Sequence, residues 1–283
     1  MATSNSLTIV NGDWGATSLR AIGAVLESAA AVLCGAFGRR ADAPIRVAPW
    51  RNRPPQVFHD RRPYEIQISA RDTYWCQYVY QFSHELCHVL VNFDHVRGHR
   101  HKWFEESLCE LAALFVLRRL PAAWRGSPPS GIVDAADFAP HFGTYAEYIA
   151  SLTPPVDPSG LPAWLSGHMA TLEADPFNRE LNRVVATALL EHFLDDPSLW
   201  RDCGWLNGWT AAADRSFADH LDSWAGRLHE HGLVGRTPEL VRTTFFVTGA
   251  AREQPSPPLP ARHPDGAVPA SEAAGSSADG SAQ

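Results

Sequence analysis

The segment His84-Glu85-Leu86-Cys87-His88 constrains the structure of this chain more than any other. It has the form H-E-x-x-H, so its two histidines are four residues apart and lie one turn apart on the same face of a helix. Their imidazoles can then bind one metal ion, and Glu85 projects beside that ion. The segment therefore predicts a helix with two zinc ligands, His84 and His88, and a carboxylate that can act as a general base.

The residues around this segment also favour a helix. Residues 73–92 contain no Gly or Pro, and most of their large apolar residues recur at steps of three and four, as in an amphipathic helix. Asp72 and Thr73 have side-chain oxygens, which we expect to cap the first free amides of the helix. The alternative is a helix in which His84 and His88 are neighbours that share no metal.

A second apolar segment, residues 102–120, offers the third protein ligand that a zinc site needs. Glu106 and Glu110 are four residues apart and share one helical face, whereas Glu105 points about 100° away. We predict that Glu106 binds the metal and that Glu110 accepts a hydrogen bond from the outer nitrogen of a bound histidine. Pro121 predicts the end of this helix. In the alternative, both acids are solvated surface residues.

The two segments together resemble those of the gluzincin metallopeptidases, the group that contains thermolysin and the aminopeptidase N-like enzymes. Those enzymes have H-E-x-x-H on one helix and a glutamate within a W-x-x-E-[GS]-like stretch on the next, often with an acid four residues further on. Residues 84–88 match the first part, and residues 103–107 with Glu110 match the second. The resemblance covers about residues 73–120 and implies a zinc metallopeptidase with Glu106 as the third ligand.

The third ligand has alternatives. The connection between the two segments is slightly shorter than is usual in gluzincins, which leaves Glu105 and Glu110 as possible ligands. Metzincins have H-E-x-x-H-x-x-G-x-x-[HD], in which the glycine allows a sharp turn before the third ligand. Here Val91 stands at the glycine position, so Asp94 or a nearby histidine is a weaker alternative, although Asn92 can adopt an unusual backbone conformation close by.

The rest of the first half has the pattern of an α+β chain. An amphipathic helix is predicted over residues 16–37, and short strands are predicted over 45–48, 56–59 and 64–69. The resembling zincins place such a strand beside the active-site helix, where its edge can pair with an extended peptide. Residues 65–70 are therefore a candidate substrate shelf, and the equally good alternative is an ordinary strand that covers a helix.

The second half is mainly helical. Turn formers at 126–131 are followed by helical patterns. These patterns cover residues 145–152, 161–174, 179–194, 206–228 and 238–247. From Arg252 onward Pro, Ala, Ser and Gly dominate, which predicts disorder. The expected fold is thus α+β and zincin-like: a catalytic part over 1–125, with a small N-terminal sheet and the active-site helices, then a helical part over 126–251 and a disordered tail over 252–283.

Composition and charge restrict the partners and the location. The net charge of −7 gives no general attraction for nucleic acid. The five cysteines are odd in number and form no C-x-x-C pair, which fits a reducing compartment. Residues 1–13 have no basic start and no long apolar core, as an export signal would, and the helix at 16–37 is interrupted by Arg20 and Glu27. We therefore predict a cytoplasmic protein with no membrane partner.

The predicted function is zinc-dependent hydrolysis. A zinc-activated water would attack a bond in a peptide or protein substrate, with Glu85 as the general base. An oxyanion stabiliser is also expected, and the candidates, which are otherwise ordinary side chains, are Tyr145, Tyr148, His141 and His168. Two alternatives remain: a non-peptidase metalloenzyme such as an iron oxygenase, because H-E-x-x-H does not itself select zinc, and a non-catalytic zinc-binding interaction protein.

Overall fold

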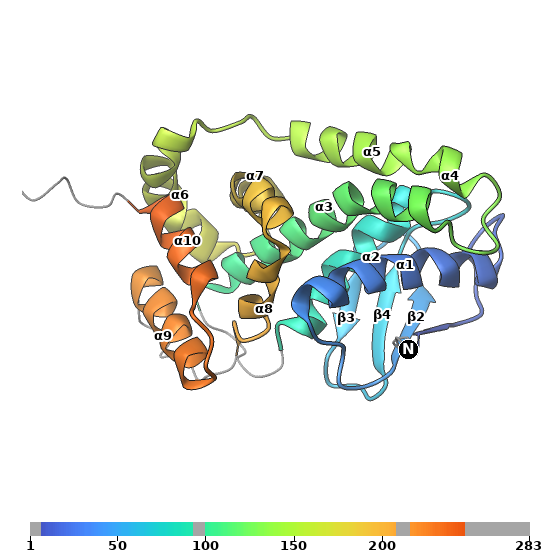
Figure 1. Ribbon diagram of the computed structural model, residues 1–283, viewed down its shortest axis with the longest axis horizontal. Coiled ribbons are helices and arrows are strands. Elements are labelled where there is room, and N and C mark those ends of the chain that lie inside the picture. Colours follow the sequence, from blue (N-terminus) through green and yellow to red (C-terminus); the bar gives the residue numbers. More distant parts are fainter. Residues whose placement is uncertain (1–6, 93–99, 208–215, 247–283) are drawn as a thin grey trace, which may run out of the picture. The chain divides into compact units, whose positions relative to one another are not determined.

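A computed structural model describes residues 7–92, 100–207 and 216–246 (Figure 1). These residues belong to one compact unit that combines a small four-stranded sheet with many helices, so the predicted α+β class is confirmed. The predicted disordered tail, residues 252–283, lies outside the described residues. The division of the chain between residues 125 and 126 stays a prediction.

The sheet consists of β1 (Leu7–Ile9), β2 (Ile45–Pro49), β3 (Gln56–Phe58) and β4 (Tyr64–Ile68), in the order β1-β2-β4-β3. β2 is parallel to β1 and β4, whereas β3 is antiparallel to β4. Because β4 has a neighbour on both sides, its backbone groups are already paired. The predicted substrate shelf at residues 65–70 is therefore wrong. β3 is the edge strand on that side of the sheet, and β1 was not predicted at all.

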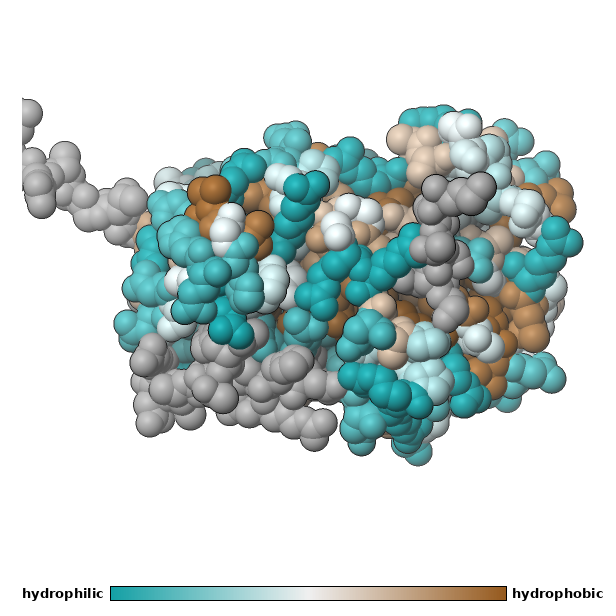
Figure 2. Space-filling model, turned by 60° about the horizontal axis from the view of Figure 1, so that its bottom comes forward, coloured by the Kyte–Doolittle hydropathy of each residue, from teal (hydrophilic) through white to brown (hydrophobic). Residues whose placement is uncertain are grey.

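Helix α1 (Leu19–Phe37) begins at Ser18, whose side chain accepts a hydrogen bond from the backbone N–H of Ala21, and ends at Gly38 in the left-handed conformation. Among the described helices, α1 is long and apolar enough to cross a membrane by length and composition. Nine of its residues are buried inside the fold, where α1 contacts α2 and β1. On the face shown in Figure 2, hydrophilic residues cover most of the surface and hydrophobic residues form smaller patches between them.

Helix α2 (Trp75–Leu90) carries the H-E-x-x-H segment, as predicted. The predicted cap is wrong, because no side chain caps the helix start, and the Asp72 carboxylate accepts instead from the backbone N–H of Ala16 at 2.6 Å. The expectation for Asn92 is confirmed. Its backbone is left-handed, with a φ of 58°, and its side chain accepts from Arg39 at 3.0 Å, so the chain turns after α2 without a glycine.

Helix α3 (Lys102–Gly126) passes through Pro121 and continues for five more residues, so its predicted end at Pro121 is wrong. The reason is tertiary packing beyond the proline. Trp124 is 1% exposed, and its ring contacts the rings of Phe138 and Phe142 at centroid distances of 6.4 and 4.8 Å. Burial of this large aromatic side chain outweighs the backbone hydrogen bond that proline removes.

The remaining elements are helical. They are α4 (Ala135–Phe138), α5 (Pro140–Ser151), η2 (Pro158–Gly160), α6 (Leu161–Ala174), α7 (Arg179–Asp195), η3 (Pro197–Leu199), α8 (Trp200–Cys203), α9 (Phe217–Glu230) and α10 (Arg236–Phe245). Of the helix predicted over 206–228, residues 206 and 207 form a turn and residues 208–215 lie outside the described residues. Helix α9 begins after a capping box in which Ser216 and Asp219 bond each other's backbone N–H. α5 and α7 pack against α3, which therefore lies at the centre of the described residues (Figure 1).

Candidate metal centre

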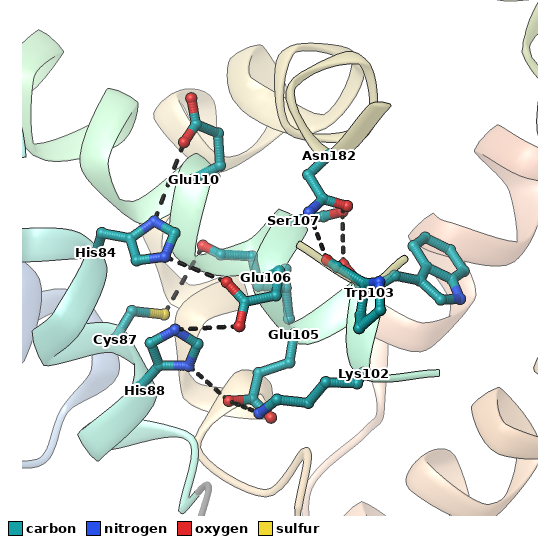
Figure 3. A network of polar contacts seen from close by, with 12 residues as sticks. His84, Cys87, His88, Lys102, Trp103, Glu105, Glu106, Ser107, Glu110 and Asn182 are labelled. Carbon is teal, nitrogen blue, oxygen red and sulfur yellow. Dashed lines mark hydrogen bonds and ion pairs between the residues drawn. The ribbon is translucent and has the colours of Figure 1, made fainter. Parts of the chain in front are cut away.

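Helices α2 and α3 bring the three predicted metal ligands together. His84 and His88 lie one turn apart on α2, with ring centroids 5.2 Å apart, and both rings point towards α3 (Figure 3). The Nε2 atom of His84 is 3.3 Å from one carboxylate oxygen of Glu106, and the Nε2 atom of His88 is 3.5 Å from the other. Glu106 thus lies between the two ring nitrogens that face each other across the site.

The outer nitrogens of both rings face other carboxylates of α3. The Nδ1 atom of His88 lies 2.6 Å from Glu105, and the Nδ1 atom of His84 lies 4.0 Å from Glu110. A ring that donates from Nδ1 keeps its lone pair on Nε2, where a metal can bind. Glu110 faces the outer nitrogen of His84, but 4.0 Å is too long for the hydrogen bond that the sequence predicted. Glu105, which the sequence places about 100° round the helix, reaches the other histidine instead.

Glu105 is fully buried and has three polar neighbours. Besides His88, the Lys102 ammonium lies 2.8 Å from its Oε1 atom, and the Asn207 amide donates to its Oε2 atom at 2.8 Å. Burial alone would raise the pKa of Glu105, but Lys102 and His88 hold it below its ordinary value. Glu105 therefore remains an ionised acceptor that fixes the orientation of the His88 ring.

Glu110 is fixed in a similar way. The Tyr80 hydroxyl donates to its Oε2 atom at 2.6 Å, and the Arg183 guanidinium donates to its Oε1 atom at 3.2 Å. Arg183 also donates to Thr153 at 3.2 Å. Because Tyr80 comes from α2 and Arg183 from α7, the Glu110 carboxylate joins three helices at the site.

Glu85 and Glu106, which both line the site, have opposite pKa shifts. Burial raises the pKa of Glu85, which is 4% exposed, although the His84 and His88 charges oppose this shift. Burial would also raise the pKa of Glu106, but the adjacent His88 and His84 hold it well below its ordinary value. One carboxylate is thus suited to bind a cation, and its neighbour is suited to accept and hold a proton.

The two histidines and the carboxylates of Glu85, Glu106 and Glu110 line a cleft of about 470 Å³. One wall comes from β3 and the residues before it, and the opposite wall from the start of α7. The sequence did not indicate three of its residues: His59, Arg179 and Asn182. His59 follows β3, and its ring centroid lies 6.2 Å from that of His88. These residues are 25 to 98 positions from His84, so no local periodicity could have found them.

The four oxyanion candidates are not in the cleft wall. Tyr145, Tyr148, His141 and His168 all lie among the described residues, and none of them lines this cleft. Tyr145 packs against Tyr80 with ring centroids 6.4 Å apart, which places it behind the site rather than in it. His59 is the imidazole that lines the cleft in addition to the two predicted ligands.

Cys109 is a second possible partner for the histidines, because ligand atoms of His84, His88 and Cys109 lie within 4.8 Å of one another. Cys109 is fully buried and does not line the cleft, and burial raises the pKa of its thiol well above the ordinary value. Glu106 contacts both Nε2 atoms from the cleft side, where a substrate can approach. We therefore take Glu106 as the better third ligand, and the alternative Asp94 lies outside the described residues.

Comparisons with protein-family models, with curated proteins and with solved structures found no match to this chain. The resemblance to gluzincins therefore stays a prediction from the two short segments at residues 84–88 and 103–110.

Proposed function

We propose that this protein is a zinc-dependent hydrolase that cleaves peptide bonds. The supporting observation is the arrangement of the two histidines. Their Nε2 atoms approach the two oxygens of one carboxylate, Glu106, at the cleft, while their Nδ1 atoms face Glu105 and Glu110. Both rings thus present the nitrogen that binds metal towards the third ligand.

The donor set fits a divalent cation. Two imidazoles and an ionised carboxylate are a common zinc site that leaves a fourth position open. Among the described residues, lysine or arginine pairs with Glu105 and Glu110, whereas neither Glu85 nor Glu106 has such an ion pair. When His84 and His88 are neutral metal ligands they no longer compensate the charge of Glu106, and a bound cation would then balance it.

The residues of the cleft have distinct roles in this proposal. When bound by His84, His88 and Glu106, zinc would lower the pKa of a water molecule and polarise a peptide carbonyl. Glu85 takes the proton from the attacking water and delivers it to the leaving amine, and its burial favours the protonated form between these two steps. His59 donates to the negative charge that develops on the carbonyl oxygen.

The test combines metal analysis with a base variant. Protein purified without added metal should contain one zinc per chain. It should also cleave a pool of random hexapeptides, with the products identified by mass spectrometry. Glu85→Gln should reduce cleavage by about 10² to 10⁴-fold and keep the zinc. Glu106→Gln should lose the zinc. Glu147→Gln, which changes an exposed acid on α5, is the control and should behave like the unaltered protein.

Three outcomes would contradict the proposal in different ways. Stoichiometric iron without zinc would favour the oxygenase. Zinc with no cleavage of any peptide by the unaltered protein would favour a non-catalytic binding protein. Full activity of Glu85→Gln would remove Glu85 as the base, even if the protein is a zinc peptidase.

A further inference from the structure

Among the described residues, Arg179 is the lysine or arginine that lines the cleft together with Glu85 and Glu106. It is exposed, and within the described residues it takes part in no hydrogen bond or ion pair. A guanidinium presents a planar set of N–H donors that matches a carboxylate in two-point contact. The Arg179 side chain therefore offers an anion-binding group in the same cleft as the proposed metal ligands.

The acids of the cleft do not need Arg179 as a partner. Glu110 already accepts from Arg183 and Tyr80, and Glu106 faces the two imidazoles. Glu85 has no arginine or lysine within ion-pair distance among the described residues. The Arg179 charge does oppose the burial-driven rise of the Glu85 pKa, but its N–H donors bond to none of the described acids and are left to bind an anion from outside the chain.

The position of Arg179 relative to the metal ligands is fixed by its neighbours on α7. Asn182, one turn further on, accepts a hydrogen bond from Ser107 at 3.2 Å, and Arg183 binds Glu110 at 3.2 Å. Both partners belong to the helix that carries Glu106, so the first turn of α7 is joined to the metal site at two points. A cation in this first turn opposes the helix dipole, so helix stability does not explain an arginine here.

We propose that Arg179 binds a carboxylate of the substrate and makes the site selective for anionic peptides. This inference deepens the proposed peptidase function and rests on it for the identity of the substrate. The carboxylate has two possible sources: the C-terminus of a short peptide and an acidic side chain near the bond that is cleaved. The same chemistry serves both, because each presents two oxygens to the guanidinium.

The experiment uses three pools of random hexapeptides, each with an acetylated N-terminus. The first pool has neutral side chains and an amidated C-terminus, the second has neutral side chains and a free C-terminal carboxylate, and the third has one Glu or Asp and an amidated C-terminus. Binding to the full-length, zinc-loaded Glu85→Gln protein is measured by ultrafiltration and mass spectrometry. Cleavage by protein with Glu85 intact is measured separately on the same pools.

We expect the protein to retain one of the two carboxylate pools about tenfold better than the neutral pool. Which of the two is retained identifies the source of the carboxylate. Arg179→Gln should bring the ratio of retained carboxylate pool to retained neutral pool down to about one. Arg179→Lys should restore part of this ratio, since lysine keeps the charge without the planar donors. Arg125→Gln, which removes an exposed arginine at the end of α3, is the matched control and should leave the ratio unchanged.

Two results would overturn the inference. The first is a ratio that does not depend on Arg179, or no preference for either carboxylate pool. The second is an equal loss of binding to all three pools in Arg179→Gln, which would indicate a general role in the cleft. The two proposals fail separately: an Arg179-dependent preference in binding, without cleavage of any pool or of the same peptides with a free N-terminus, would refute the peptidase only. Cleavage without such a preference would refute only the role of Arg179.

Discussion

The buried stretch of α3, residues 103–117, has an acidic half and an apolar half with opposite chemistry. Residues 103–110 are all buried and include three glutamates, Glu105, Glu106 and Glu110. Residues 111–117 are also buried and are all apolar. The helix is enclosed on every side because α2, α5 and α7 pack around it, as α1 does to a smaller extent. One central helix therefore contains both the apolar centre of the fold and its largest group of buried carboxylates.

This difference shows which half contributes to stability and which to function. Burying apolar side chains contributes about 25 cal/mol per Å² removed from water. Burying a carboxylate costs free energy unless a partner compensates for it, and a buried ion pair is often no more stable than an apolar pair of similar size. The apolar half of this stretch thus supplies the stability that lets the acidic half keep charged groups in place for the proposed cation and substrate.

The largest effect on stability is expected in the apolar half. Phe115 is 1% exposed, and its ring lies 5.5 Å from Trp200, which also contacts Phe37 and Phe193. Phe115→Ala should lower the free energy of unfolding by about 3 to 5 kcal/mol in urea titrations, because it removes a large buried ring and leaves a cavity. The control is Leu152→Ala, a change at a residue that is 48% exposed, with an expected effect within about 0.5 kcal/mol.

Phe115→Ala also tests whether the two halves are separable. If the protein binds zinc as proposed, the folded variant should retain it, since Phe115 lies more than one turn beyond Glu110. A folded variant that has lost the metal would show that the apolar half positions the ligands, and the contrast between the halves would then be wrong.

A substitution in the ion pair of the acidic half should cause a smaller loss of stability, and a second substitution should reverse part of that loss. Arg183→Met removes the guanidinium from Glu110 and leaves a buried carboxylate with less compensation, which should cost about 3 kcal/mol. Adding Glu110→Gln removes the uncompensated charge and should recover more than half of that loss. The measurement is a double-mutant cycle of the free energy of unfolding, in which a coupling near zero would mean that the pair is energetically independent.

The matched control for this cycle joins the same two helices. Arg118 on α3 lies 3.4 Å from Glu191 on α7, but both side chains are largely solvent-accessible, at 36% and 69%. Arg118→Met should therefore cost less than about 1 kcal/mol. If both arginine variants were equally destabilising, burial would not be the cause of the larger effect.

The part of the site that depends on spacing within one helix could be predicted from the sequence. His84 and His88 share a face because they are four residues apart, and Glu106 and Glu110 share one for the same reason. The three ligands approach one another because the two helices pack side by side, a step that the residues alone only suggested by resemblance. Glu105 illustrates the limit: its direction on the helix was predicted, but its contact with His88 depends on how the helices are rotated relative to each other.

Other features depended on contacts between distant residues. Pro121 is a strong signal for a helix end, yet the burial of Trp124 against α4 and α5 extends the helix beyond it. Asp72 is a suitable cap for α2, but the amide of Ala16 competes for its carboxylate. The strand predicted as a substrate shelf lies in the interior of the sheet. The alternation of polar and apolar residues indicates a strand but does not indicate its place in the sheet.

The smallest effect is expected from a single hydrogen bond in the acidic half. The Tyr80 hydroxyl donates to Glu110 at 2.6 Å, so Tyr80→Phe should lower the free energy of unfolding by about 1.5 to 3 kcal/mol at pH 8, the range for a hydrogen bond to a charged group. Tyr148→Phe, at a residue that is 56% exposed, is the control. A loss below about 0.5 kcal/mol would mean that the Glu110 carboxylate is held by Arg183 alone.

The pH dependence of the stability difference between the unaltered protein and Tyr80→Phe identifies its cause. Burial, and then the Glu110 charge, raise the pKa of Tyr80 above its ordinary value of about 10. Above pH 10 the unfolded chain releases the phenol proton and the folded chain keeps it, so rising pH favours unfolding of the unaltered protein but not of Tyr80→Phe. The stability difference between the two should thus shrink by about 1.4 kcal/mol by pH 11. A constant difference would mean that Tyr80 titrates normally in the fold, and then Glu110 would have to be far less buried or less charged than its partners indicate.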